Sequence, residues 1–237
     1  MKRSLPFIII LIVLAVAVGA AWYATRPTPG STTVVNPSSP ASPNKPASTA
    51  RPAPLVGMPG AEPAHTLGSA NARAHIEEFG DFQCPPCSMF HPILEQMHEE
   101  FGDKLRITFR EYPLPGHNHA MAAASAAEAA GMQKKFWEMH ALIYEHQAEW
   151  KDRYEVAPIF EGYAKQIGLD IERWKRDVQS EQVSQRIFLD NRRGHSMGVK
   201  GTPTAFLNGR ELPFETLMAA DKLRAVIQNE IDATGSR

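Results

Sequence analysis

The sequence has few cysteines and almost no excess of charge. Cys84 and Cys87 are the only cysteines among 237 residues, and neither a second CxxC pair nor an H-x3-H pair occurs. A tetrahedral zinc site therefore lacks its second half. The formal net charge is −1, which gives no reason to expect nucleic acid or another strongly charged partner. No internal repeat is present.

The N-terminus carries a long apolar run. Residues 1–3 are Met-Lys-Arg, and residues 5–24 contain no charged side chain, which is long enough to span a bilayer as a helix. We expect residues 1–25 to form a membrane anchor whose basic end stays in the cytoplasm. The alternative is a signal peptide cleaved after Val-Gly-Ala at 18–20. Either segment would export the rest of the chain to a periplasmic or other extracytoplasmic space, where disulfides persist.

Residues 26–64 are rich in proline. They contain ten of the nineteen prolines, separated mainly by Ser, Thr, Ala and Asn. Such a segment cannot bury enough apolar surface to fold, so we predict a semi-stiff, disordered linker. It has no apolar periodicity that would serve dimerisation, and we expect a monomer. Residues 65–237, roughly 175 in number, suffice for one domain with a substantial core.

The domain shows strand patterns at both ends and helical patterns between them. Apolar alternation predicts strands, one of them central, at 75–79, 105–112 and 204–207, with an edge strand or turn at 65–70. Asn208-Gly209 is a hairpin signal, and 210–212 is the returning strand. Helical spacing predicts helices at 85–101, 119–130, 133–147 and 155–167, two more capped by Asp170 and Ser180, and a closing helix at 214–233.

The two cysteines lie where a strand turns into a helix. Residues three apart share one face of a first helical turn, so the two sulfurs can close a small ring. Cys84 falls at the helix start, where unpaired N–H groups and the helix dipole favour a thiolate, the reactive form. The pattern indicates a redox pair with Cys84 as nucleophile and Cys87 as resolving thiol. A plain structural disulfide remains open, as does a metal site completed by His91, His117 or His119.

Several of these features resemble one protein family. Cys84-Pro85-Pro86-Cys87 follows a strand, Pro92 lies in the next helix, and Thr202-Pro203 occurs far downstream. Together they resemble the thioredoxin superfamily, and more closely the DsbA-like extracytoplasmic thiol-disulfide oxidoreductases, from about residue 72 to the C-terminus. The resemblance implies an α/β thioredoxin fold with a helical insertion at about 117–198, preceded here by the transmembrane helix and linker.

The resemblance also implies roles for residues outside the pair. Thr202-Pro203 would form a cis bond beside the cysteines, where Thr202 offers backbone groups to an extended substrate. An ordinary trans proline is the alternative. Glu78 stands where the family places a buried acid that relays a proton to Cys87, although Glu77 competes for the inward position. Phe82 is expected in an apolar, substrate-binding rim around the cysteines.

The sequence therefore predicts an enzyme that oxidises cysteines of exported proteins through a Cys84–Cys87 disulfide. No prosthetic group is needed, and by resemblance a membrane quinone-linked thiol oxidase would restore the disulfide. A reductase or isomerase on the same fold is an alternative. An extracytoplasmic metal-binding chaperone that uses both cysteines is another.

Two residues depart from the best-known DsbA-like pattern. Pro86 replaces a histidine often found between the cysteines, and Thr202 stands where some members have valine. Pro85 and Pro86 have no N–H to offer a thiolate. We therefore expect the pKa of Cys84 to be depressed less than in members with that histidine, and the pair to be a weaker oxidant.

Overall fold

The computed structural model describes residues 55–235. The apolar run 5–24, predicted to be a membrane anchor, and residues 26–54 of the predicted linker lie outside the described residues. Within 55–235, no helix combines the length and the apolar character that a membrane span requires.

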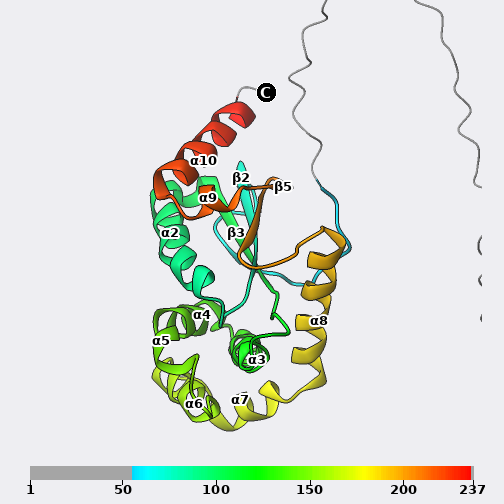
Figure 1. The fold of residues 1–237 in the computed structure, drawn as a ribbon, viewed down its shortest axis with the longest axis vertical. Helices are drawn as coiled ribbons and strands as arrows, with labels where there is room; N and C mark the ends of the chain where they lie inside the picture. Colours follow the sequence, from blue (N-terminus) through cyan, green and yellow to red (C-terminus); the bar gives the residue numbers. More distant parts are fainter. Residues whose placement is uncertain (1–54, 236–237) are drawn as a thin grey trace, which may run out of the picture. The chain divides into compact units, whose positions relative to one another are not determined.

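A five-stranded mixed sheet forms the centre of the described domain (Figure 1). Its order is β1-β3-β2-β4-β5. β2 runs parallel to β3, and the other neighbours are antiparallel. The strands are β1 (His65–Leu67), β2 (Ala74–Gly80), β3 (Leu105–Glu111), β4 (Thr204–Leu207) and β5 (Arg210–Glu211). The central position predicted for 75–79 and the edge strand predicted within 65–70 are confirmed.

The turn between β4 and β5 explains how the last two strands pair. Asn208 and Gly209 both have positive φ, 47° and 78°. A two-residue hairpin turn of this kind needs positive φ at both positions, which asparagine and glycine adopt at the least cost. The hairpin predicted from the Asn-Gly pair is confirmed.

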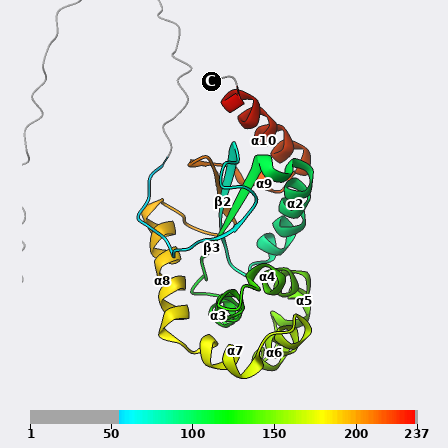
Figure 2. The same ribbon diagram turned by 180° about the vertical axis from the view of Figure 1, so that it is seen from behind.

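Helices cover the two faces of the sheet differently. α2 (Pro85–Phe101), α9 (Phe214–Leu217) and α10 (Ala220–Gly235) lie on one face, and α8 (Glu181–Ser196) lies on the other (Figures 1 and 2). Side chains of β2, β4, α2 and α10 form one apolar core, including Ile76, Leu94, Leu207 and Ile227. The predicted single closing helix is wrong, because residues 218–219 separate α9 from α10.

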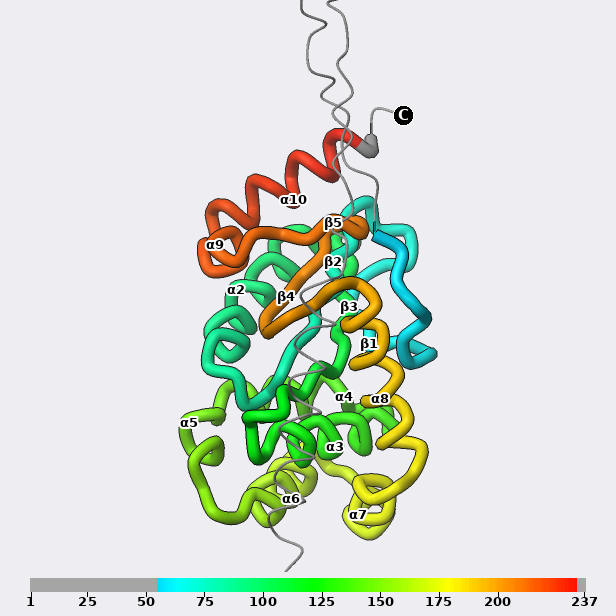
Figure 3. Tube along the Cα trace, turned by 45° about the vertical axis from the view of Figure 1, so that its right-hand side comes forward, coloured from blue at the N-terminus to red at the C-terminus, as the bar shows by residue number. Residues whose placement is uncertain are grey.

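The remaining helices gather beyond one end of the sheet (Figures 1 and 3). They are α3 (Ala120–Gly131), α4 (Phe136–Glu145), α5 (Gln147–Trp150), α6 (Ala157–Gln166) and α7 (Ile171–Val178). The Asp170 side chain accepts from the Arg173 N–H at the start of α7, and Ser180 accepts from the Val183 N–H at the start of α8. Both caps, and a helical insertion between β3 and β4, were predicted.

The predicted linker, residues 26–64, extends too far toward the C-terminus, because the folded domain already includes residues 55–64. Residues 55–64 are described and contact the domain. The Ala61 N–H donates to Asp190 at 2.7 Å, the Ala61 carbonyl accepts from Arg110 at 2.7 Å, and Leu55 N–H donates to the Gly209 carbonyl at 2.7 Å. Backbone groups in a proline-rich stretch find side-chain partners here, which composition alone does not reveal.

Candidate active site

The two cysteines lie at the junction of β2 and α2. Cys84 is the N-cap residue of α2, and Pro85 and Pro86 occupy its first positions, where the missing N–H groups would have no helical partner. The N–H groups of Cys87 and Ser88 donate to the Cys84 carbonyl at 3.1 and 3.3 Å. This geometry places the Cys84 side chain at the positive end of the helix.

Both cysteines are free thiols, and their environments differ. Cys84 is 5% exposed and Cys87 is fully buried. A hydrogen bond from the Cys87 thiol, with smaller help from Thr202 and the Cys87 N–H, lowers the pKa of Cys84 to about 6 against the opposing effect of burial. Burial, and then the neighbouring Cys84 sulfur, raises the pKa of Cys87 well above its usual value. At neutral pH, Cys84 is mostly a thiolate and Cys87 a thiol.

Thr202 and Pro203 lie against the sulfur of Cys84. The Cys84 thiol donates to the Thr202 carbonyl at 3.3 Å, and the Thr202–Pro203 bond is cis, as predicted. The Thr202 hydroxyl is buried and has no hydrogen-bond partner in this dithiol state. It can therefore donate to Cys84 once the sulfur is a thiolate. A groove of about 410 Å³ runs along the same loop, lined by residues that include Lys200, Pro203 and Phe214.

Glu78 projects from β2 into the interior below the pair. It is 2% exposed, and one carboxyl oxygen has no hydrogen-bond partner. Burial, reinforced by the charge of Cys84, raises the pKa of Glu78 to about 8, so the carboxyl keeps its proton at neutral pH. Its charge, when present, contributes to the raised pKa of Cys87. Glu78 therefore lies within electrostatic reach of both sulfurs, and the proton relay to Cys87 that the resemblance implied stays a prediction.

A cavity of about 150 Å³ leads away from Glu78. It is lined by side chains of β2, α2 and α4 and by Leu67 and Ile107, among them Glu78, His91, Glu95, His98, Glu99 and His140. The cavity therefore joins a buried acid to polar groups nearer the surface of α2.

Asp81 organises the turn before Cys84, and the sequence reasoning missed it. The side chain is 1% exposed and accepts from Gln83 N–H at 2.7 Å, Leu114 N–H at 2.8 Å and His117 Nδ1 at 2.7 Å. A carboxylate that bonds to the backbone two residues on is a common turn device. The position of Asp81 between a strand and the CxxC pair was a usable signal.

Gln83 and Gln147 fasten the cysteine turn to the helical insertion. Gln147, from α5, donates to the carbonyls of Phe82 at 2.6 Å and Cys84 at 3.0 Å. The Gln83 side chain donates to the Lys151 carbonyl at 2.8 Å and accepts from His119 N–H at 2.6 Å. No local sequence pattern marks Gln147, because its partners lie more than sixty residues away along the chain.

Phe82 does not belong to a rim around the cysteines. It is 1% exposed, and its ring packs against Tyr144 at 4.7 Å and against Phe109 and His140 at 5.4 Å between centroids. The Phe82 side chain points into the protein and fills the core between the sheet and the helical insertion. The predicted substrate-binding role of Phe82 is corrected accordingly.

The histidines considered for a metal site are dispersed. His117 bonds to Asp81, and His119 bonds to the Arg153 carbonyl at 2.7 Å. His91 is 7% exposed and lies on α2. Among the described residues, the one group of three close metal-binding side chains is His91, Glu95 and Glu145, which includes neither cysteine.

The family model described as "Thioredoxin" matches residues 61–229. Among curated proteins, the Na(+)/H(+) antiporter NhaA 1 of Mycolicibacterium vanbaalenii is 38% identical over 150 residues, which cover 61% of this chain and 23% of that protein. The NhaA of Herminiimonas arsenicoxydans is 33% identical over 161 residues, covering 67% and 25%. The chain thus spans about a quarter of the length of the curated relatives it matches.

Solved structures give a likeness over most of the described domain. BdbD from Bacillus subtilis in its oxidised form has a TM-score of 0.66 at 22% identity, over 76% of this chain and 98% of that one. The thiol-disulfide exchange protein alpha-DsbA2 from Wolbachia pipientis has 0.61 at 20%, over 70% and 86%. The catalytic domain of Proteus mirabilis ScsC has 0.59 at 19%, over 71% and 89%. The family model places this chain in the thioredoxin family, and its fold, with helices inserted between β3 and β4, is like that of these structures.

Proposed function

We propose that the protein is an extracytoplasmic thiol-disulfide oxidoreductase that oxidises cysteine pairs of exported proteins. The observation that carries the proposal is the opposite tuning of the two thiols. A pKa of about 6 makes Cys84 a good leaving group, while Cys87 is buried with a raised pKa. Two proteins of similar fold carry this chemistry in their names, a thioredoxin-like oxidoreductase from Silicibacter pomeroyi and the thiol-disulfide exchange protein alpha-DsbA2, and they support the proposal.

The reaction begins with the Cys84–Cys87 disulfide. A substrate thiolate attacks the Cys84 sulfur, a mixed disulfide forms, and the electron pair of the broken S–S bond goes to Cys87. A thiolate at Cys87 is unfavourable because the site is buried, so it takes a proton. Glu78, which is protonated below about pH 8, supplies that proton and regains one from water through the cavity.

The second step releases the product. A second substrate thiolate attacks the substrate sulfur of the mixed disulfide, and Cys84 leaves as a thiolate. The substrate dithiol has then lost two electrons to form a disulfide, and the enzyme holds a Cys84 thiolate and a Cys87 thiol. Only protein sulfur takes part, so we propose that no prosthetic group is required. A membrane quinone-linked thiol oxidase is the proposed electron acceptor for reoxidation.

The substrate approaches along the Thr202-Pro203 loop. Cys84 is only 5% exposed, so a substrate cysteine must come to the edge where the sulfur meets this loop. An extended segment laid along the neighbouring groove would find backbone groups of residues 200–202 to pair with. This arrangement suits unfolded, newly exported chains, whose backbone is free.

The test uses the full chain and a peptide that carries two reduced cysteines. Cys84→Ser should abolish its oxidation. Cys87→Ser is given the disulfide form of the same peptide instead: the Cys84 thiolate attacks it, one peptide sulfur leaves as a thiol, and the mixed disulfide should accumulate because the resolving thiol is gone. Mixed disulfides that form only in the Cys84 variant would reverse the two roles. A glutathione titration then measures the reduction potential of the Cys84–Cys87 pair, which decides between an oxidase and a reductase. A potential in the range of cytoplasmic thioredoxin would make the protein a reductase instead.

The location is a separate proposal. We propose that residues 5–24 anchor the protein, with residues 55–235 on the extracytoplasmic side. Cell fractionation and sequencing of the mature N-terminus test it. A soluble product that begins near residue 21 would replace the anchor with a cleaved signal and leave export unchanged.

A further inference from the structure

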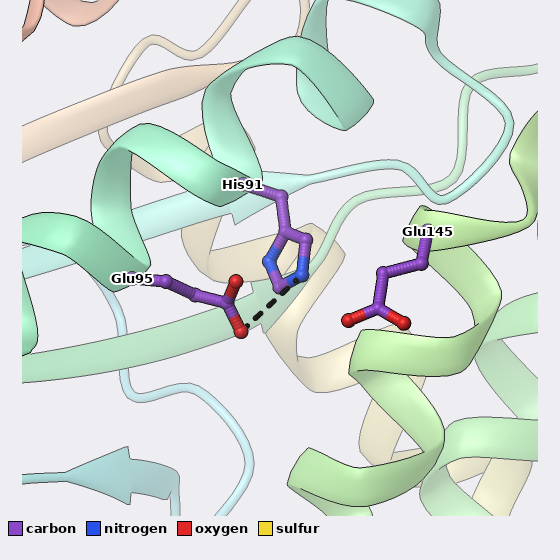
Figure 4. Close-up of side chains that lie close together, drawn as sticks. All are labelled: His91, Glu95 and Glu145. Atoms are coloured by element: carbon purple, nitrogen blue, oxygen red, sulfur yellow. Dashed lines mark ion pairs between the residues drawn. The ribbon is translucent and has the colours of Figure 1, made fainter.

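Three metal-binding side chains converge where α2 meets the helical insertion, and neither cysteine is among them. His91 and Glu95 are one turn apart on α2 and share a face, and Glu145 is the last residue of α4. One ligand atom from each lies within 4.8 Å of the other two. Figure 4 shows the His91 ring between the two carboxylates, with its nitrogen directed toward Glu95 at 3.5 Å.

His91 is held in place without using its outer nitrogen. The residue is 7% exposed, yet Nε2 has no hydrogen-bond partner. The Tyr144 ring stacks on it at 5.3 Å, and the His140 ring meets it edge-on at 5.1 Å. Buried polar atoms are normally satisfied, so an unpartnered nitrogen in a fixed ring indicates a missing ligand.

The two carboxylates lack cationic partners within the described part of the chain. Glu95 has no ion pair beyond the contact with His91, and Glu145 has none that the structure records between 55 and 235. A cation between the two neighbouring carboxylates would offset their mutual repulsion, and a ligand set of one imidazole and two carboxylates makes it a metal ion.

We propose that His91, Glu95 and Glu145 bind one divalent transition-metal ion of the zinc type. Zinc takes one histidine nitrogen and carboxylate oxygens at about 2.0–2.2 Å. Ligand atoms around such an ion lie about 3–3.5 Å apart, so the exposed glutamate side chains must close by about 1 Å. Calcium and magnesium fit less well, because they prefer oxygen ligands alone.

The position of the site gives the ion two properties. Three protein ligands leave at least one coordination position for water, and the cavity of about 150 Å³ borders His91 and Glu95. The ion would also link α2 to α4, and so join the thioredoxin core to the helical insertion. Metal binding should therefore raise the midpoint of thermal unfolding, because a ligand that binds only the folded state stabilises it.

The test titrates zinc into the full chain without a histidine tag, in its disulfide form so that the cysteines offer no thiolate. Calorimetry should give one zinc per chain and a rise in the unfolding midpoint. Glu145→Gln, an exposed substitution that leaves the helices intact, should weaken binding at least 10-fold. Glu99→Gln is the matched control, since it removes a nearby acid of α2 outside the trio, and should change affinity less than 2-fold.

Further variants separate the site from general acidic attraction. His91→Ala, checked for folding by circular dichroism, should lose zinc binding, and calcium should bind far more weakly than zinc to the parent. No zinc binding by the parent would overturn the proposal. Equal losses in Glu145→Gln and Glu99→Gln, or calcium binding as tight as zinc binding, would also overturn it, because the acidic surface alone would then explain the result.

Discussion

Glu77 and Glu78 are neighbours on β2 whose side chains point to opposite faces of the sheet. At neutral pH the carboxyl of Glu77 is ionised and that of Glu78 keeps its proton. Both are nearly buried, at 6% and 2% exposed. Burial pushes the pKa of Glu77 up, but hydrogen bonds from Arg193 and Arg110 outweigh it, and the pKa is lowered. Glu78 has no such cation, and burial raises its pKa to about 8. The partner, more than burial, decides whether a buried carboxyl is charged.

The two faces of the sheet therefore differ in role: the α8 face holds an ion-pair network, and the α2 face holds the acid next to the cysteines. On the α8 face, Glu77 accepts from Arg110 at 2.8 Å and from Arg193 at 2.6 and 2.7 Å, while Asp190 accepts from Arg110 at 3.0 Å. On the α2 face, Glu78 has a carboxyl oxygen without a partner and a cavity beside it. The satisfied network fixes the fold, and the unsatisfied acid is available to exchange a proton.

Glu77→Gln should have the largest effect on stability. Removing one partner of a buried ion pair typically costs about 3–5 kcal/mol, and Asp190 still pairs with Arg110, so we expect about 3 kcal/mol. Urea unfolding at neutral pH measures it. Glu78→Gln is the matched control and should not destabilise the protein, because a buried neutral acid becomes a neutral amide and the unfolded chain no longer gains by ionising this side chain. Equal losses in both variants would contradict the contrast between the two faces.

Glu78→Gln should instead slow the chemistry. A positioned acid or base contributes about 10²–10⁴-fold, and water in the cavity can partly replace it, so we expect about 100-fold slower oxidation of a dithiol peptide. Stopped-flow fluorescence at pH 7 follows the reaction. Glu99→Gln, which alters another acid lining the cavity, should keep the parent rate. A parent rate in Glu78→Gln would remove Glu78 from the mechanism.

Much of this site follows from local sequence, and the rest does not. The span of α2, its cysteines and its prolines are set within a few residues, and the predicted helix 85–101 is observed. The cis bond at Thr202 and the inward direction of Glu78 were predicted through resemblance. Which of Glu77 and Glu78 is charged depends on Arg193, more than a hundred residues away, which no local pattern identifies.

The errors have a common physical cause. Phe82 was predicted to lie in a rim around the cysteines because it comes just before them in the sequence, yet the helical insertion covers it. Gln147 and the contacts of residues 55–64 were missed for the same reason, since tertiary partners decide them. Local sequence patterns predict helices and strands well. They predict poorly which side chains are buried where the helical insertion packs on the core.

The pH dependence of stability should distinguish the two redox states. Glu78 has a folded pKa of about 8 against 4.5, so its contribution is full below 4.5 and is lost as pH rises toward 8. Cys84 has a folded pKa of about 6 against 9.0, so its contribution is present above 9.0 and is lost as pH falls toward 6. Between its unfolded and folded pKa values, each group changes the free energy of unfolding by about 1.4 kcal/mol per pH unit.

Between pH 6 and 8 the two effects therefore oppose each other in the dithiol form. In the disulfide form only the Glu78 effect remains, so stability should fall more steeply with pH there. Urea midpoints across pH 5 to 9, in both redox states, measure it, and the difference between the two redox states removes the shared contribution of Glu78, Asp190 and other acids. Parallel curves in the two redox states would contradict the assigned pKa of Cys84.

Thr202→Val should give the smallest effect. The variant keeps the shape of the side chain but removes the hydroxyl that lowers the pKa of Cys84, so that pKa should rise. Thr202→Ser keeps the hydroxyl and serves as the control. Thiolate absorbance against pH measures both. An unchanged pKa in Thr202→Val would leave the Cys87 thiol and the helix start as the sources of the shift.

The most direct test of the account is the titration of the parent dithiol protein by thiolate absorbance. We expect one transition near pH 6, absent in Cys84→Ser and moved to higher pH in Cys87→Ser, because the Cys87 thiol is the largest source of the lowered pKa of Cys84. A parent protein with no transition below about pH 8, or a transition near pH 6 that survives in Cys84→Ser, would contradict it.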